Sequence, residues 1–157
     1  MKEAQGDLWT WGTPDVRAVT TNGFLKPDGA LVMGRGCAQQ ARDRWPGLDK
    51  RIGKLIKDFG WDRVYPIDVG EPWLLMTFPV KPDQVNGIPG FKARAEIEII
   101  EKSAKRLASF AEVMREAIPG EYLLPRPGCG NGGLSWPQVK EVIAPILDDR
   151  FVVITNH

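Results

Sequence analysis

The sequence predicts an α/β fold in which helices cover both faces of a mixed central sheet, giving a three-layer α/β/α sandwich. β-prone runs alternate with amphipathic helical segments along the 157 residues, a pattern typical of a sheet covered by helices. Apolar residues make up 43% of the chain and charged residues 26%, as in ordinary folded domains. Repeats, low-complexity tracts and linkers are lacking in the sequence, so we expect residues 1–157 to form one domain.

The first half of the chain predicts one strand followed by a long turn region and two helices. Residues 16–20 are β-prone and end at Asn22-Gly23, a pair typical of turns. The segment 23–32 contains a second turn signature, Lys26-Pro27-Asp28-Gly29. Helices are expected at 37–45 and 48–59, because Pro46-Gly47 interrupts an otherwise helical pattern.

The second half predicts three strands and two helices. A buried strand is expected at 73–80, ending near Pro79 because proline donates no backbone hydrogen bond. Residues 81–92 are expected to be a long loop. Residues 95–117 form the clearest helix, since apolar side chains recur there at three- and four-residue spacing. Strands at 121–124 and 151–155 flank a helix at 136–147, for which Ser135 is the expected N-cap.

Charge and cysteine content narrow the classes of protein. The net charge of +1 creates no overall field that would attract a nucleic acid or a membrane. Two cysteines do not make a disulfide framework, which favours a reducing compartment. The sequence has no apolar signal-peptide region and no apolar stretch of roughly 20 residues that could span a bilayer. We therefore expect a cytoplasmic monomer without a membrane partner.

Two of the expected strands run into glycine-rich loops that lead into helices. One loop contains Met33-Gly34-Arg35-Gly36, and the other is Gly128-Cys129-Gly130-Asn131-Gly132-Gly133. Backbone N–H groups of such loops can bind phosphate where strands end and helices begin, and two loops suit a diphosphate. Neither loop matches a Walker A or a dinucleotide-binding motif. The alternative is that the glycines serve only as turns and helix starts.

Several segments together resemble the macrodomain family. They are Gln5-Gly6-Asp7-Leu8, Thr20-Thr21-Asn22, Met33-Gly34-Arg35-Gly36-Cys37-Ala38 and Gly128-Cys129-Gly130-Asn131-Gly132-Gly133-Leu134-Ser135-Trp136. They are most similar to the branch containing the terminal ADP-ribose glycohydrolases and the DarG-like antitoxins, which remove ADP-ribose from DNA. The resemblance implies a three-layer fold that binds ADP-ribose across the top of the sheet, as ligand or product, with no cofactor.

The resemblance also implies roles for individual residues. Asp7 would accept a hydrogen bond from the adenine amine, and Asn22 would hold the distal ribose. Gly34 and Gly36 would donate from their backbones to the distal phosphate, with charge added by Arg35. The other side of the diphosphate would be wrapped by Gly128, Cys129, Gly130, Asn131, Gly132 and Gly133. Asp7 and Asn22 could instead be ordinary turn residues.

The catalytic residues of the relatives have no matching residues in this chain. Their lysine after the first loop has no counterpart in residues 41–46, and their two aspartate positions fall on Gly132 and Ala38. The candidates are therefore Asn22 and, in the longer first loop, Lys26 and Asp28 as a general base or charge clamp. The alternative for that loop is a solvated turn.

Nucleophilic and metal chemistry have little support in the sequence. The only histidine is the last residue, His157, which argues against a Cys-His pair at Cys129, a Ser-His-Asp triad and a zinc site. We therefore interpret Cys129 as a small loop residue.

The leading functional hypothesis is a glycohydrolase that removes ADP-ribose from modified DNA or protein. Positioning and electrostatics could supply much of the catalysis. The missing lysine and aspartate favour the alternative, a non-catalytic ADP-ribose reader, and a structural protein is a third possibility. Basic residues at helical spacing could face DNA phosphates or form a solvated face; they are Lys50, Arg51, Lys54 and Lys57.

Overall fold

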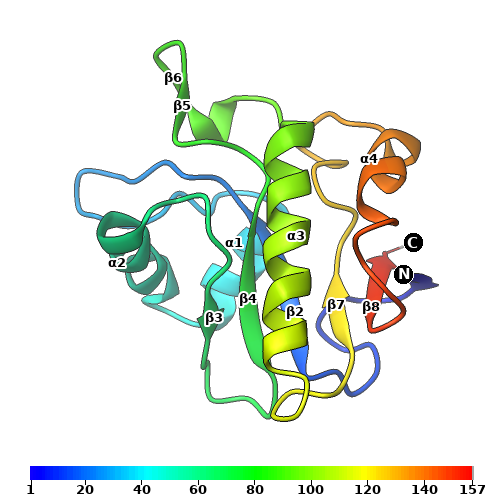
Figure 1. Ribbon diagram of the computed structural model, residues 1–157. Helices are drawn as coiled ribbons and strands as arrows, with labels where there is room; N and C mark the ends of the chain where they lie inside the picture. The colour runs from blue at the N-terminus through cyan, green and yellow to red at the C-terminus, as the bar shows by residue number, and fades with distance from the viewer. Residues whose placement is uncertain (157) are drawn as a thin grey trace.

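A six-stranded mixed sheet forms the centre of the molecule (Figure 1). The computed structural model describes residues 1–156. Five neighbouring strands run parallel, and a short edge strand runs antiparallel to the last of them. In spatial order the strands are β1 (Lys2–Gln5), β8 (Phe151–Thr155), β7 (Tyr122–Leu124), β2 (Val16–Thr21), β4 (Leu74–Pro79) and β3 (Pro66–Ile67).

Helices cover both faces of this sheet, which confirms the three-layer α/β/α sandwich. α3 (Ile97–Val113) and α4 (Trp136–Ile143) pack on one face, and α1 (Gly36–Arg44) and α2 (Leu48–Phe59) pack on the other (Figure 1). Alternate residues of β2 point to opposite layers, as a strand requires. Val16 and Ala18 belong to the apolar core under α3, whereas Val19 belongs to the core under α1 and α2.

Most of the expected elements are present, with shifted ends. α3 begins two residues later than expected and ends at Val113, and α4 ends at Ile143. Ser135 precedes α4 as expected, but its side chain makes no capping hydrogen bond. Two strands of the central sheet were not expected, namely β1 and β3 at its two edges. No helix within residues 1–156 has both the length and the apolar character needed to cross a membrane.

The expected loop 81–92 has structure of its own, so that expectation was wrong. It contains a hairpin of β5 (Gln84–Val85) and β6 (Ile88–Pro89), followed by the 3₁₀ turn η1 (Gly90–Lys92). The turn of this hairpin is Asn86-Gly87, and both residues have positive φ angles, 49° and 82°. Asn-Gly is the pair that tight hairpins favour, because both positions need a left-handed backbone.

The long first loop, residues 22–35, packs against α2. The backbone N–H of Leu31 donates to the carbonyl oxygen of Asp49 at 3.0 Å. Nearby, a Cβ atom added to Gly53 of α2 would lie 1.9 Å from the carbonyl oxygen of Gly29. The loop can therefore reach this position only because residue 53 has no side chain.

Replacing Gly53 with alanine should destabilise the fold. The added methyl group would push the Gly29 backbone away, and overpacking of this kind costs about 1–3 kcal/mol or more. The free energy of unfolding, measured with urea, checks this. Gly34→Ala is the control, because an added Cβ there has no atom within 4 Å. Equal stability of the two variants would contradict the close approach of loop and helix.

Candidate functional site

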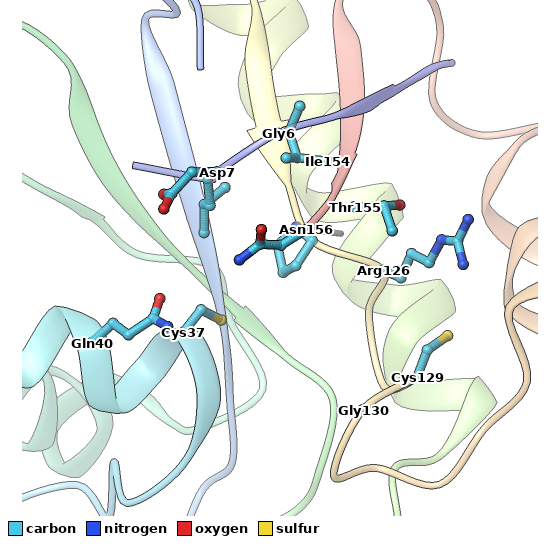
Figure 2. Close-up of a pocket in the computed structure, with 12 residues that line it drawn as sticks. Gly6, Asp7, Cys37, Gln40, Arg126, Cys129, Gly130, Ile154, Thr155 and Asn156 are labelled. Carbon is cyan, nitrogen blue, oxygen red and sulfur yellow. The ribbon is translucent and has the colours of Figure 1, made fainter. Parts of the chain in front are cut away.

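A cavity of about 340 Å³ opens at the end of the sheet where the parallel strands finish (Figure 2). Four segments contribute to its wall: the turn after β1, the first turns of α1, the segment after β7 and the end of β8. The lining residues are Gly6, Asp7, Leu8, Cys37, Gln40, Pro125, Arg126, Cys129, Gly130, Ile154, Thr155 and Asn156. Segments distant in the sequence meet here because parallel strands all present their carboxyl ends at one edge.

The second glycine loop forms one side of this region. Gly128 and Gly133 have φ angles of 73° and 79°, which non-glycine residues rarely adopt. A Cβ added to Gly132 would lie 2.5 Å from the Gly128 carbonyl oxygen, so Gly132 is required for packing within the loop. Gly130 differs from these, because it lines the cavity and an added Cβ would meet no atom within 4 Å.

The first glycine loop lies beside the second one. A Cβ added to Gly36, whose φ is 59°, would lie 3.8 Å from the Nδ2 atom of Asn131. Gly34, Arg35 and Gly36 are exposed, and α1 begins at Gly36 without a side-chain N-cap. Uncapped N–H groups and the positive end of a helix attract anions. The two loops thus present backbone donors to a shared space.

A buried arginine supports the turn that carries Asp7. Arg17 of β2 is 4% exposed, and its Nη1 donates to the carbonyl oxygens of Leu8 and Trp11. Burial lowers the pKa of Arg17, while the nearby Asp7 carboxylate opposes that shift. Asp7 itself is exposed, and its Oδ1 accepts from the backbone of Trp9 at 2.7 Å. The turn therefore holds Asp7 at the cavity wall while leaving Oδ2 without a protein partner among residues 1–156.

Arg126 is a cavity residue that the sequence analysis missed. Its guanidinium lies 5.1 Å from the ring centre of Trp136, whose Nε1 donates to Oε1 of Glu3 at 2.9 Å. Lys140 lies 2.6 Å from the other Glu3 oxygen, and this hydrogen bond lowers the pKa of Glu3. One feature of the sequence could have identified Arg126. It lies three residues before Cys129, where the chain leads into the second glycine loop.

Lys81 is a second missed residue. It lies two residues after the end of β4, is half-buried, and its Nζ donates to the carbonyl oxygen of Phe91 at 3.4 Å. Burial is the main reason that the pKa of Lys81 is lowered, and the positive charge of Arg35 adds to the effect. The backbone N–H of Gly23 donates to the carbonyl oxygen of Pro82 at 3.1 Å, so Lys81 lies beside the start of the long first loop. Only the pairing of β4 with β2 brings these segments together.

The three candidate catalytic residues occupy the long first loop. Asn22 closes this loop: its Nδ2 donates to Val32 at 2.8 Å, and its Oδ1 accepts from Phe24 at 2.7 Å. Asp28 makes a similar local bond to the backbone of Ala30. Lys26 and Asp28 are exposed on the turn beside α2, and neither lines the cavity. The structure thus brings Asp7 and Gly130 to one cavity but leaves Lys26 and Asp28 outside it.

The two cysteines also line the cavity, and both are free thiols. Burial raises the pKa of Cys37 and of Cys129, which keeps the thiols protonated and poorly nucleophilic. His157, considered above as a possible partner, lies outside the described residues. Across residues 1–156, histidine, cysteine and acidic side chains form no cluster of three or more that could hold a metal ion.

Comparison with known proteins shows which proteins this chain resembles. No protein-family model matches the chain. Two curated relatives, the DNA ADP-ribosyl glycohydrolases of Mycobacterium tuberculosis (strain ATCC 25618 / H37Rv) and Mycobacterium bovis (strain BCG / Pasteur 1173P2), are each 25% identical over 138 residues. The alignment covers 84% of this chain and 36% of each relative, so the chain spans about a third of their length.

Solved structures decide the fold. The macrodomains of Mycobacterium tuberculosis DarG and Thermus aquaticus DarG each match with a TM-score of 0.74 and 24% identity, over 98% of this chain and 95% of theirs. The chain has the macrodomain fold. Thermosipho africanus DarTG in complex with ADP-ribose matches with a TM-score of 0.73 and 20% identity, over 99% of this chain and 42% of that one. Among macrodomains, this one resembles the DarG type.

Replacing Glu3 with glutamine should destabilise this macrodomain in a pH-dependent way. In the folded protein the pKa of Glu3 is lowered. The stability that its ionised carboxylate contributes is therefore fully present well above pH 4.5 and is lost as the pH falls through the lowered pKa. Because the pair of Glu3 and Lys140 is partly exposed, we expect the free energy of unfolding to fall by about 1 kcal/mol at neutral pH. Urea unfolding at neutral and acidic pH measures it, with Glu141→Gln on the same helix as Lys140 as control. A cost that persists unchanged in acid would contradict the assignment to the charged pair.

Proposed function

We propose that this macrodomain binds ADP-ribose along the carboxyl edge of its sheet. The observation that carries the proposal is the meeting of two glycine loops beside a cavity that also contains Asp7. In this arrangement the adenine amine donates to Asp7, and the diphosphate lies between Gly34–Gly36 and Gly128–Gly133. Thermosipho africanus DarTG, a relative of similar fold, was solved in complex with ADP-ribose, which supports the same assignment.

We further propose that the chain hydrolyses the bond between ADP-ribose and a modified macromolecule, with DNA as the leading carrier. The name of its mycobacterial relatives, DNA ADP-ribosyl glycohydrolase, supports this reaction. In it, the bond from the anomeric carbon to the carrier breaks, a bond to the oxygen of water forms, and a proton passes from water to the carrier. ADP-ribose leaves as product, and the reaction needs no cofactor.

We propose that Lys81, which lies beside the start of the long first loop, accepts the proton of the attacking water. Its lowered pKa increases the neutral, basic fraction near pH 7. Arg35, whose positive charge also contributes to the lowered pKa of Lys81, would hold the distal phosphate and so fix the ribose. Asn22, Lys26 and Asp28 remain proposals for catalysis. The hydrogen bonds of Asn22 within its own loop favour an indirect role, in which Asn22 shapes the first loop around the ribose.

A reader without catalytic activity is the second candidate. The observation that favours it is the position of Asp28, the expected carboxylate, on an exposed turn outside the described cavity. In either case we propose a cytoplasmic monomer, consistent with two free cysteines. An assay for release of ADP-ribose separates the enzyme from the reader.

Calorimetric titration should show that ADP-ribose binds with a micromolar or lower dissociation constant, equivalent to about 8 kcal/mol or more. Gly130→Val should abolish this binding without lowering the melting temperature, because the new side chain enters the open cavity. Gly130→Ala should have a smaller effect. If the wild-type protein does not respond to millimolar ADP-ribose, the proposed binding is wrong.

Lys81→Ala should reduce single-turnover release of ADP-ribose from modified DNA by about 10²–10⁴-fold, the usual contribution of a general base. In the wild type the rate should rise with pH and level off below the usual pKa range of lysine, because the neutral form is the active one. Lys81→Arg, which stays charged, should be as slow as Lys81→Ala. Lys26→Ala and Asp28→Ala test the competing base: a large loss in either variant, with normal Lys81→Ala, would contradict the assignment to Lys81.

A further inference from the structure

Gln40 lines the cavity in Figure 2, yet no contact in the proposed binding of ADP-ribose involves it. It belongs to α1, and its side chain is exposed. Its Oε1 accepts a hydrogen bond from Nε1 of Trp9 at 2.7 Å. Because an indole N–H can only donate, this bond fixes which end of the amide is the oxygen and which is the NH2 group.

The NH2 group of Gln40 is available to a ligand. Figure 2 shows the amide extending from α1, with its nitrogen on the side of Cys37, another lining residue. Within residues 1–156 the hydrogen bond to Trp9 is the only one that this amide makes, and it uses the oxygen. The nitrogen can therefore donate to a group that enters the cavity.

Trp9 connects Gln40 with Asp7. The backbone N–H of Trp9 donates to Oδ1 of Asp7 at 2.7 Å, and its indole donates to Gln40. One residue thus occupies one oxygen of each polar side chain. The groups that remain for a ligand are the acceptor Oδ2 of Asp7 and the donor Nε2 of Gln40, and both side chains line the same cavity.

The ring of Trp9 is held firmly by its neighbours. Trp9 is 8% exposed, and its ring centre lies 5.6 Å from that of Trp45 and 6.2 Å from that of Trp73. The guanidinium of Arg44 lies 5.0 Å from the Trp9 ring centre. A ring packed in this way has little freedom to rotate, so the amide of Gln40 is positioned before a ligand arrives. Such preorganised groups lose less entropy on binding.

A fixed acceptor with a fixed donor matches one edge of adenine. The exocyclic amine of adenine donates, and the ring nitrogens on its two sides, N1 and N7, accept. Asp7 is the proposed acceptor for the amine, which leaves a ring nitrogen without a side-chain donor. Nε2 of Gln40 supplies such a donor from the same cavity wall.

We propose that Gln40 is a specificity-determining residue whose Nε2 donates to a ring nitrogen beside the adenine amine, and that Trp9 positions it. The inference rests on the proposed binding of ADP-ribose and deepens it, because two side chains rather than Asp7 alone select the base. The alternative is a structural role, in which Gln40 only ties α1 to Trp9.

Analogues of ADP-ribose that lack one ring nitrogen test the contact. Calorimetry gives dissociation constants for ADP-ribose, for an analogue with carbon in place of N1 and for one with carbon in place of N7. In the wild type, one of the two analogues should bind roughly tenfold more weakly than ADP-ribose, the value of one hydrogen bond. In Gln40→Met, which keeps the length of the side chain but not its donor, that analogue should bind as tightly as ADP-ribose. Gln39→Met, at the neighbouring exposed position outside the cavity, is the matched control.

Two further variants separate reading of the base from structural support. Gln40→Glu keeps the acceptor for Trp9 but removes the donor, so it should also abolish the preference for ADP-ribose over the weaker analogue. The added charge affects all three ligands alike, since they share the diphosphate, and Gln39→Glu controls for it. Trp9→Phe keeps Gln40 but removes the indole N–H, and it should reduce the same preference. Trp73→Phe, in the same aromatic cluster, should leave the preference unchanged.

The outcomes separate this inference from the proposed function. Failure of the wild type to bind ADP-ribose would overturn both. Equal binding of all three ligands by the wild type would overturn only the role of Gln40. An analogue that is weakened by the same factor in the wild type and in Gln40→Met would do so too, because another group would then contact the ring nitrogen. An unchanged preference in Trp9→Phe would overturn the positioning role of Trp9.

Discussion

The parallel register of five strands is the constraint on which the site depends. β1, β8, β7, β2 and β4 all point the same way, so every segment that follows one of them begins at the same edge. That geometry places the Asp7 turn, the two glycine loops and Lys81 in one region although they are spread over more than a hundred residues of sequence. Antiparallel pairing would send neighbouring loops to opposite edges.

Within that region, rigidity comes from groups that do not touch the proposed ligand. Arg17 fixes the turn beneath Asp7, and Glu3 with Trp136 fixes the surroundings of Arg126. Gly53 admits the long first loop to the surface of α2. A site assembled this way needs little rearrangement on binding, which reduces the entropic cost of association.

The sequence correctly predicted the helices and strands that have a clear pattern of residues within their own segment. Residues 48–59 carry a clear helical period between two glycines, and 151–155 is an apolar run, and both match the structure almost residue for residue. β1 was missed because Lys2–Gln5 has no apolar alternation, and it is a strand only through its pairing with β8. Lys81 and Arg126 were missed for a related reason. Their importance depends on which segments lie beside them, and a single sequence carries no local signal for that.

The glycine loops show a different limit. The resemblance implied that Gly130 and Gly132 both wrap the diphosphate, yet the structure distinguishes Gly130, which faces open space, from Gly132, which is packed against its own loop. The resemblance to macrodomains implied a functional role for Asn22. Its side chain is largely occupied by the backbone of the following loop, a local competition that composition does not reveal.

The edges of the sheet have a consequence for behaviour at high concentration. β3 is two residues long and begins with a proline, which has no N–H to offer a neighbouring chain. At the opposite edge, β1 carries the exposed charges of Lys2 and Glu3. Short edges with proline and charged side chains resist the addition of further strands. The sheet therefore ends within one molecule, and its ordered backbone does not act as a template for aggregation.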